Sequence, residues 1–145
     1  MIRLADGNDA ARIAEIVELA YRGYVASIGA VPGPLLDDYP ARVAAGQAWV
    51  VGDPVMGALV LLDYPDHLLL DNIAVDPAAQ GTGVGRALME FADAEALRRG
   101  YRELRLYTHQ RMLRNIELYK KLGWEETGRG EQAGLARVFF RKPVG

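Results

Sequence analysis

The chain has 145 residues, of which 50% are hydrophobic and 25% are charged, and its formal net charge is -2. This length suits one domain over residues 1–145 with its own core, and the near-neutral charge excludes a global basic field that would hold nucleic acid. The absence of cysteine excludes disulfides and thiolate catalysis, and His67 and His109 are too far apart in sequence for a short-spaced metal motif. We therefore expect no bound metal.

The N-terminal stretch is charged from Arg3 onward and has no apolar run that ends in a small-residue cleavage site. It therefore does not resemble a secretory signal, and we expect a cytoplasmic protein. The most apolar region, residues 48–75, is divided by aspartates and prolines into pieces of strand length. We read these pieces as neighbouring strands and expect no membrane span.

The first half of the chain predicts strands and two helices separated by a breaker-rich connection. Asn8 or Asp9 is placed to cap the first helix, whose apolar face includes Ile13 and Ile16. The stretch GAVPGPLLDDYP, residues 29–40, ends this helix, and short turn sequences between the later strands favour antiparallel neighbours. The expected strands span 2–4, 48–51, 55–63 and 67–75, and a short helix covers 41–46.

The second half of the chain predicts a βαβ crossover and a closing hairpin. A helix that begins near Val84 stops at Gly100 and leads to a strand at 103–108, so this strand and the one before the helix should be parallel. A further helix covers 113–122 and ends at Gly123, and the segments 124–130 and 135–142 close the chain as a hairpin. The fold class is therefore α/β, with a mixed, mostly antiparallel sheet flanked by about four helices.

Three glycines at alternate positions, Gly81, Gly83 and Gly85, lie between a strand and a helix in AVDPAAQGTGVGRALMEF. The first N–H groups of a helix lack intrahelical partners and carry partial positive charge, and glycine lets a phosphate approach them without meeting a Cβ atom. A P-loop would need Lys and then Ser or Thr after the last glycine, where the chain has Arg86 and an alanine. A dinucleotide fingerprint would need G-x-G-x-x-G, which differs from the spacing here.

The segment Q-G-T-G-V-G resembles the pyrophosphate-binding signature Q/R-x-x-G-x-G/A of the GNAT superfamily, the acetyl-CoA-dependent N-acetyltransferases, with Gln80, Gly83 and Gly85 on the defining positions. The resemblance extends to DNIAVDP upstream and NIELYKKLGW downstream. It implies that acetyl-CoA is the co-substrate. Its pyrophosphate would rest on Gly81, Gly83, Gly85 and Arg86, Gln80 would brace the loop, and its pantetheine would pair with the backbone of Ile73 and Val75.

By the same resemblance Tyr119 is the general acid that protonates the departing thiolate, a role that suits a phenol with an ordinary pKa near ~10; the alternative is an aromatic residue of the core. Many family members have asparagine seven residues before this tyrosine, where the chain has Met112. Asn115, one helical turn closer, either takes over the cofactor contact or is a surface residue.

Asp71 is the candidate base, because it lies two residues before Ile73 on the strand that should border the site. A strand-end aspartate that faces solvent is the alternative. The ribosomal-protein N-terminal acetyltransferases share a similar NIAVDP but have glutamate at the place of Tyr107, which counts against protein N-terminal acetylation. An acyl-enzyme route is disfavoured, since the one serine, Ser27, lacks a nucleophile motif.

The same resemblance implies that residues 29–40 form a wall of the acceptor site, where Asp37, Asp38 and Tyr39 would suit a small cationic amine. Either aspartate alone also fits a loop or a helix cap. We thus expect direct transfer of acetyl from acetyl-CoA to a small-molecule amine. The alternatives are a noncatalytic acyl-CoA sensor, a protein N-terminal acetyltransferase and a dinucleotide-dependent oxidoreductase. The sequence leaves the oligomeric state open, with a homodimer among the alternatives.

Overall fold

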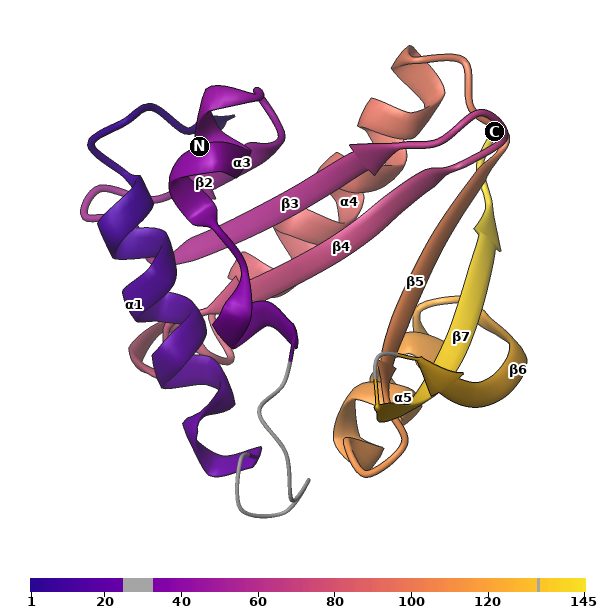
Figure 1. Cartoon of the computed structure of the whole chain (residues 1–145). Helices are drawn as coiled ribbons and strands as arrows, with labels where there is room; N and C mark the ends of the chain where they lie inside the picture. The colour runs from indigo at the N-terminus through magenta and orange to yellow at the C-terminus, as the bar shows by residue number, and fades with distance from the viewer. Residues whose placement is uncertain (25–32, 133) are drawn as a thin grey trace.

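One mixed sheet organises the protein (Figure 1). The computed structural model describes residues 1–24, 33–132 and 134–145, and in these residues seven strands follow the order β1-β2-β3-β4-β5-β7-β6. Every neighbouring pair is antiparallel except β4 and β5, which are parallel, as the βαβ crossover predicted. The strands are β1 Ile2–Leu4, β2 Ala48–Val51, β3 Gly57–Asp63, β4 Leu68–Val75, β5 Glu103–His109, β6 Glu125–Gln132 and β7 Leu135–Pro143.

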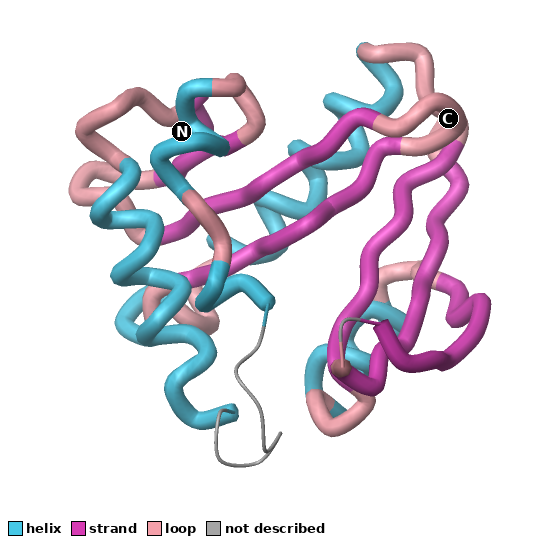
Figure 2. The backbone as a smooth tube through the Cα atoms, in the orientation of Figure 1, coloured by secondary structure: helices cyan, strands magenta, loops and turns pink. Residues whose placement is uncertain are grey.

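Helices cover both faces of this sheet (Figure 2). Successive residues of β3 alternate between the two cores, because side chains of a strand point to opposite faces: Val60 packs with α1 and α3, whereas Leu59 and Leu61 pack with α4 and α5. The α/β class with about four flanking helices is therefore confirmed. The α-helices of the described residues are α1 Ala10–Tyr21, α3 Tyr39–Ala44, α4 Val84–Arg98 and α5 Leu113–Lys121, and the 3-10 turns are η1 Arg22–Tyr24, η2 Gly33–Leu36 and η3 Pro77–Ala79.

Three local predictions need correction. The short helix α3 begins at Tyr39 rather than at residue 41, because the carboxylate of Asp38 accepts a hydrogen bond from the Ala41 N–H and caps it there. The strand β3 begins at Gly57 rather than at residue 55, because the Met56 N–H closes a turn onto the Val51 carbonyl. Asp9 does precede α1, but its carboxylate binds the Arg3 guanidinium and gives the helix no side-chain cap.

The sheet opens between its two parallel strands. β4 and β5 pair only at Leu68 with Leu104 and at Leu69 with Arg105, and beyond these residues they diverge (Figure 1). On their other sides, β4 stays paired with β3 as far as Val75, and β5 stays paired with β7 as far as His109. The inner edges of β4 and β5 therefore face each other across a gap that no strand of the described chain fills.

Candidate functional site

A β-bulge places Asp71 at this opening. On β3, Val60 pairs with Asn72 and the next residue, Leu61, pairs with Leu70, so Asp71 is the extra residue of β4. A bulge re-aims the side chains beside it. The half-buried Asp71 consequently lines the cavity between β4 and β5, together with Ile73 and Tyr107.

The glycine segment forms a tight connection from β4 to α4. Gly81 and Gly83 have positive φ angles of 80° and 89°, and a Cβ atom at either position would meet no described atom within 4 Å. Gly83 is the residue before α4. The Ala87 N–H donates to the Gly83 carbonyl, and no N–H of α4 before Ala87 has a partner in the described chain. The N–H groups of Gly85 and Arg86 are left for an anion at the positive end of the helix.

The residues expected to hold the cofactor lie together along one groove of about 430 Å³. They come from β4, the glycine segment and α5, which are separated in sequence but adjacent in the fold. The residues required by the resemblance therefore share one surface, although nothing in the sequence spacing alone places α5 beside the loop. The groove is lined by Ile73, Val75, Gln80, Gly81, Gly83, Gly85, Arg86, Asn115 and Tyr119.

Tyr119 lies where this groove meets the smaller cavity between β4 and β5, and it lines both. Its ring packs edge-on to Phe140, with centroids 5.7 Å apart, and burial raises the pKa of its phenol to about 12. Its hydroxyl has no hydrogen-bond partner among the described residues. Tyr119 is thus both a core residue and a protonated phenol with a free hydroxyl at the junction.

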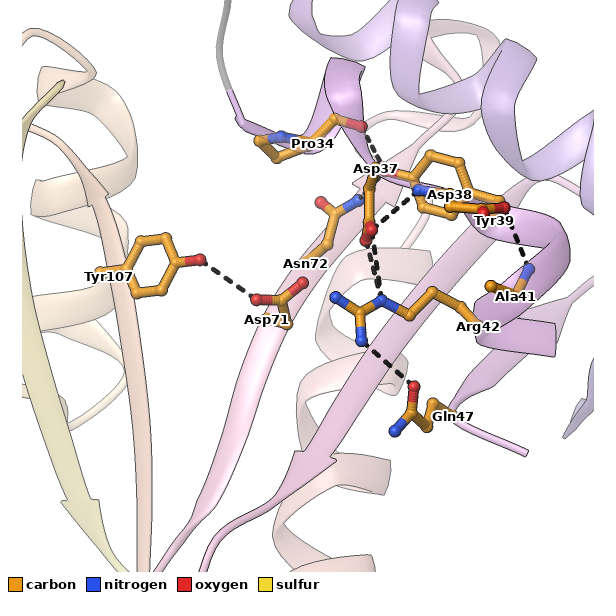
Figure 3. Close-up of polar contacts among 10 residues, drawn as sticks. All are labelled: Pro34, Asp37, Asp38, Tyr39, Ala41, Arg42, Gln47, Asp71, Asn72 and Tyr107. Atoms are coloured by element: carbon orange, nitrogen blue, oxygen red, sulfur yellow. Dashed lines mark hydrogen bonds and ion pairs between the residues drawn. The ribbon is translucent and has the colours of Figure 1, made fainter. Parts of the chain in front are cut away.

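Asp71 and Tyr107 form a hydrogen-bonded pair across the opening (Figure 3). The Tyr107 hydroxyl donates to the Asp71 carboxylate at 3.1 Å. Burial raises the pKa of Asp71 above its ordinary value, and the hydrogen bond from Tyr107 opposes this shift. Burial also raises the pKa of Tyr107 to about 12, so the phenol keeps its proton and the carboxylate is the proton-accepting member of the pair.

The three residues predicted to hold the acceptor make contacts within the fold (Figure 3). The Asp37 carboxylate pairs with Arg42 at 3.1 Å, and the Asp38 carboxylate caps α3. The buried Tyr39 donates its hydroxyl hydrogen bond to the Pro34 carbonyl and accepts one from Asn72 at 2.9 Å. Asp37 and Asp38 thus have structural partners, and their contact with an acceptor stays a prediction. Ser27 and residues 29–32 lie outside the described part of the chain.

Three residues at the junction, Tyr21, Asn72 and Arg137, were not singled out in the sequence. Tyr21, at the end of α1, lines both the groove and the cavity, as does Met112, and Asn72 and Arg137 line the cavity. The Arg137 guanidinium lies over the Tyr107 ring, 4.0 Å from its centroid. On β7, Leu135, Arg137 and Phe139 alternate with Ala136, Val138 and Phe140, a pattern that assigns Arg137 to one face but does not reveal its burial.

The histidines have ordinary local partners. The Nδ1 atom of His67 lies 2.7 Å from the Asp66 carboxylate, and Nδ1 of His109 accepts the Arg111 N–H. Within residues 1–24, 33–132 and 134–145, no three metal-type side chains group together, and no helix is both long and apolar enough to cross a membrane.

Known proteins share this sequence and fold in part. The chain is 38% identical over 105 residues to the mycothiol acetyltransferase of Jonesia denitrificans, which covers 72% of this chain and 28% of that protein. It is 43% identical over 61 residues to the [ribosomal protein bS18]-alanine N-acetyltransferase of Escherichia coli, which covers 42% of this chain and 41% of that protein. The chain thus spans less than half the length of these curated relatives.

Solved structures match nearly the whole chain. The PaiA N-acetyltransferase of Thermoplasma acidophilum, in complex with coenzyme A, gives a TM-score of 0.82 at 16% identity and covers 99% of this chain and 98% of that one. The protein YncA of Salmonella typhimurium, solved with its cofactor acetyl-CoA, gives 0.74 at 24% identity and covers 100% and 94%. At these identities the likeness shows the fold. Residues 44–126 match the acetyltransferase (GNAT) domain, and the chain therefore belongs to the GNAT acetyltransferase family.

Proposed function

We propose that the protein transfers an acetyl group from acetyl-CoA to the amine of a small molecule by direct attack on the thioester. The observation that carries this proposal is the junction at Tyr119, where the groove lined by the glycine segment meets the cavity that contains Asp71. Acetyl-CoA supplies the acetyl thioester. Its pyrophosphate suits the free N–H groups of Gly85 and Arg86, beside the open space at Gly81 and Gly83.

The inner edge of β4 holds the pantetheine arm in this proposal. Ile73 and Val75 pair with β3 on one side and face the opening on the other, so their backbone can add one further strand-like partner. A backbone N–H in this region polarises the thioester carbonyl, and such a donor contributes on the order of 3 kcal/mol to the transition state.

Two side chains handle the protons. Asp71 accepts the proton that the amine loses as its nitrogen bonds to the acetyl carbon, directly or through one water. Tyr119 donates its phenolic proton to the sulfur as the carbon–sulfur bond breaks. Asp71 then releases its proton to solvent and the Tyr119 phenolate takes one up from solvent, which restores both groups for the next turnover. The burial that raises both pKa values suits this pair, because Tyr119 stays protonated at neutral pH and Asp71 becomes a stronger base.

Release of free thiol from acetyl-CoA, measured with a panel of small amines and an alanine-terminated peptide, tests the proposal. We expect turnover with small amines. Tight binding of acetyl-CoA without turnover of any amine would instead support an acyl-CoA sensor. Acetylation of the peptide alone would support a protein N-terminal acetyltransferase, and binding of a nicotinamide cofactor in place of acetyl-CoA would overturn the assignment.

A further inference from the structure

Arg137 is a buried charged side chain that forms no ion pair within the described chain. It is 9% exposed, it makes no ion pair or hydrogen bond within the described chain, and its Nε atom is wholly buried without an acceptor. One face of its guanidinium rests on the Tyr107 ring, which leaves the N–H groups at its edge free. Burying a cation without an anion is costly, so this arrangement is suited to a negatively charged ligand.

The other arginines near the opening differ in this respect. Arg42 pairs with Asp37, and both Arg105 and Arg141 pair with Glu103, at 2.5 and 2.8 Å. These three side chains line the wider groove that continues from the cavity, together with Arg137. Arg137 is thus the arginine among these four whose charge is left for a ligand.

A second polar atom in the same cavity is also without a partner. The Pro34 carbonyl can only accept a hydrogen bond, so the Tyr39 hydroxyl donates to it and must accept from the Asn72 amide nitrogen. This relay fixes the orientation of the Asn72 amide. Its oxygen, Oδ1, is buried with no hydrogen-bond donor in the described chain, although Asn72 lines the cavity beside Asp71.

We infer that the acceptor is a small amino acid, whose carboxylate pairs with Arg137 and whose amine donates to Asn72 Oδ1 beside Asp71. The inference rests on the proposed function and names its substrate class. A carboxylate matches the two parallel N–H donors of a guanidinium. A phosphate dianion fits less well, because the same cavity contains the Asp71 carboxylate and Arg137 supplies a single charge. Asp71 then accepts the proton of the same amine.

The test compares acceptors that differ only in this carboxylate. Acetylation of β-alanine and of β-alaninamide is measured with the native protein and with Arg137→Met, and kcat/KM is expressed as the ratio of acid to amide. The change in this ratio between proteins cancels the different intrinsic reactivities of the two amines. We expect the ratio to fall at least tenfold in Arg137→Met and to be partly restored in Arg137→Lys. Arg129→Met is the matched control, because Arg129 is exposed on β6 and pairs with Glu126.

Calorimetry with propionate, which has the carboxylate but no amine, examines the subsite without turnover. We expect propionate to bind the native protein and Arg129→Met, and to bind Arg137→Met at least tenfold more weakly. If the acid-to-amide ratio is the same in Arg137→Met and propionate binding is unchanged, the inference is wrong even though acetyl transfer proceeds. If no amine is acetylated while propionate binding still depends on Arg137, the proposed function fails and the anion subsite stands.

Discussion

Replacing Tyr119 with phenylalanine separates the proposed catalytic role of its hydroxyl from the packing role of its ring. The hydroxyl has no hydrogen-bond partner in the described chain, so its removal leaves no buried group unpaired. The ring keeps its contacts with Phe140 at 5.7 Å and Trp124 at 6.3 Å between centroids. We therefore expect the free energy of unfolding to change by no more than about 0.5 kcal/mol. Loss of a general acid lowers kcat by about 100-fold, or roughly 2.7 kcal/mol in the barrier.

The assay follows free thiol at saturating acetyl-CoA and acceptor, and calorimetry gives the dissociation constant of acetyl-CoA. We expect this constant to be nearly unchanged, because the proton is donated only as the transition state forms. Tyr101→Phe is the control, since Tyr101 does not line the groove and its hydroxyl donates to the Asp63 carboxylate at 2.9 Å. If kcat of Tyr119→Phe stays within twofold of native, the acid is another group, and Tyr21→Phe at the same junction is the next variant to measure.

Three further predictions concern the base, the glycine segment and the acidic loop. Asp71→Asn should lower kcat and raise the free energy of unfolding at pH 7, measured in urea. Burial raises the pKa of Asp71 in the folded protein, so the native protein loses stability as the pH rises through that pKa, whereas the amide does not ionise. The stability difference between the variant and the native protein should therefore vanish below the ordinary pKa of 3.8. Gly83→Ala, at a φ of 89°, should cost about 1–2 kcal/mol of stability and weaken acetyl-CoA binding at least tenfold by calorimetry. Gly85→Ala is the control, because its Cβ would meet Val75 at an ordinary 3.6 Å, and it should preserve stability and acetyl-CoA binding. Equal losses of acetyl-CoA affinity in the two variants would contradict the loop assignment. Asp38→Ala should lower stability by about 1 kcal/mol through loss of the α3 cap. If the acidic loop also contacts the acceptor, the KM of the acceptor should rise in this variant, and an unchanged KM would leave Asp38 with the helix cap alone.

The parts of the site that could be predicted are those specified by neighbouring residues. Glycines between a strand and a helix indicate an anion-binding loop because the backbone geometry is local, and the structure does place Gly83 directly before α4 with a positive φ angle. The parallel β4 and β5 could likewise be predicted, since one helix of suitable length connects them.

The parts that could not be predicted depend on residues far apart in the chain. Asn72 binds Tyr39, 33 residues earlier, and Tyr107 binds Asp71, 36 residues earlier. The bulge at Asp71 depends on the register with β3, and the burial of Arg137 depends on how β7 lies beside β5. Hydrophobic periodicity indicates which face a residue occupies but not which distant side chain covers it.

The opening between β4 and β5 also affects how the sheet meets other polypeptides. A strand edge with unpaired N–H and C=O groups invites another chain to add to it. At the outer margins of the sheet this hazard is limited, because β1 has only three residues and β6 carries exposed charged residues at Glu125, Arg129 and Glu131. The unpaired edges in the middle belong to one divergent pair of strands, β4 and β5, inside a sheet whose two faces are covered by helices. An added strand there would have to enter between β4 and β5, so this edge differs from the open margins at which sheets associate.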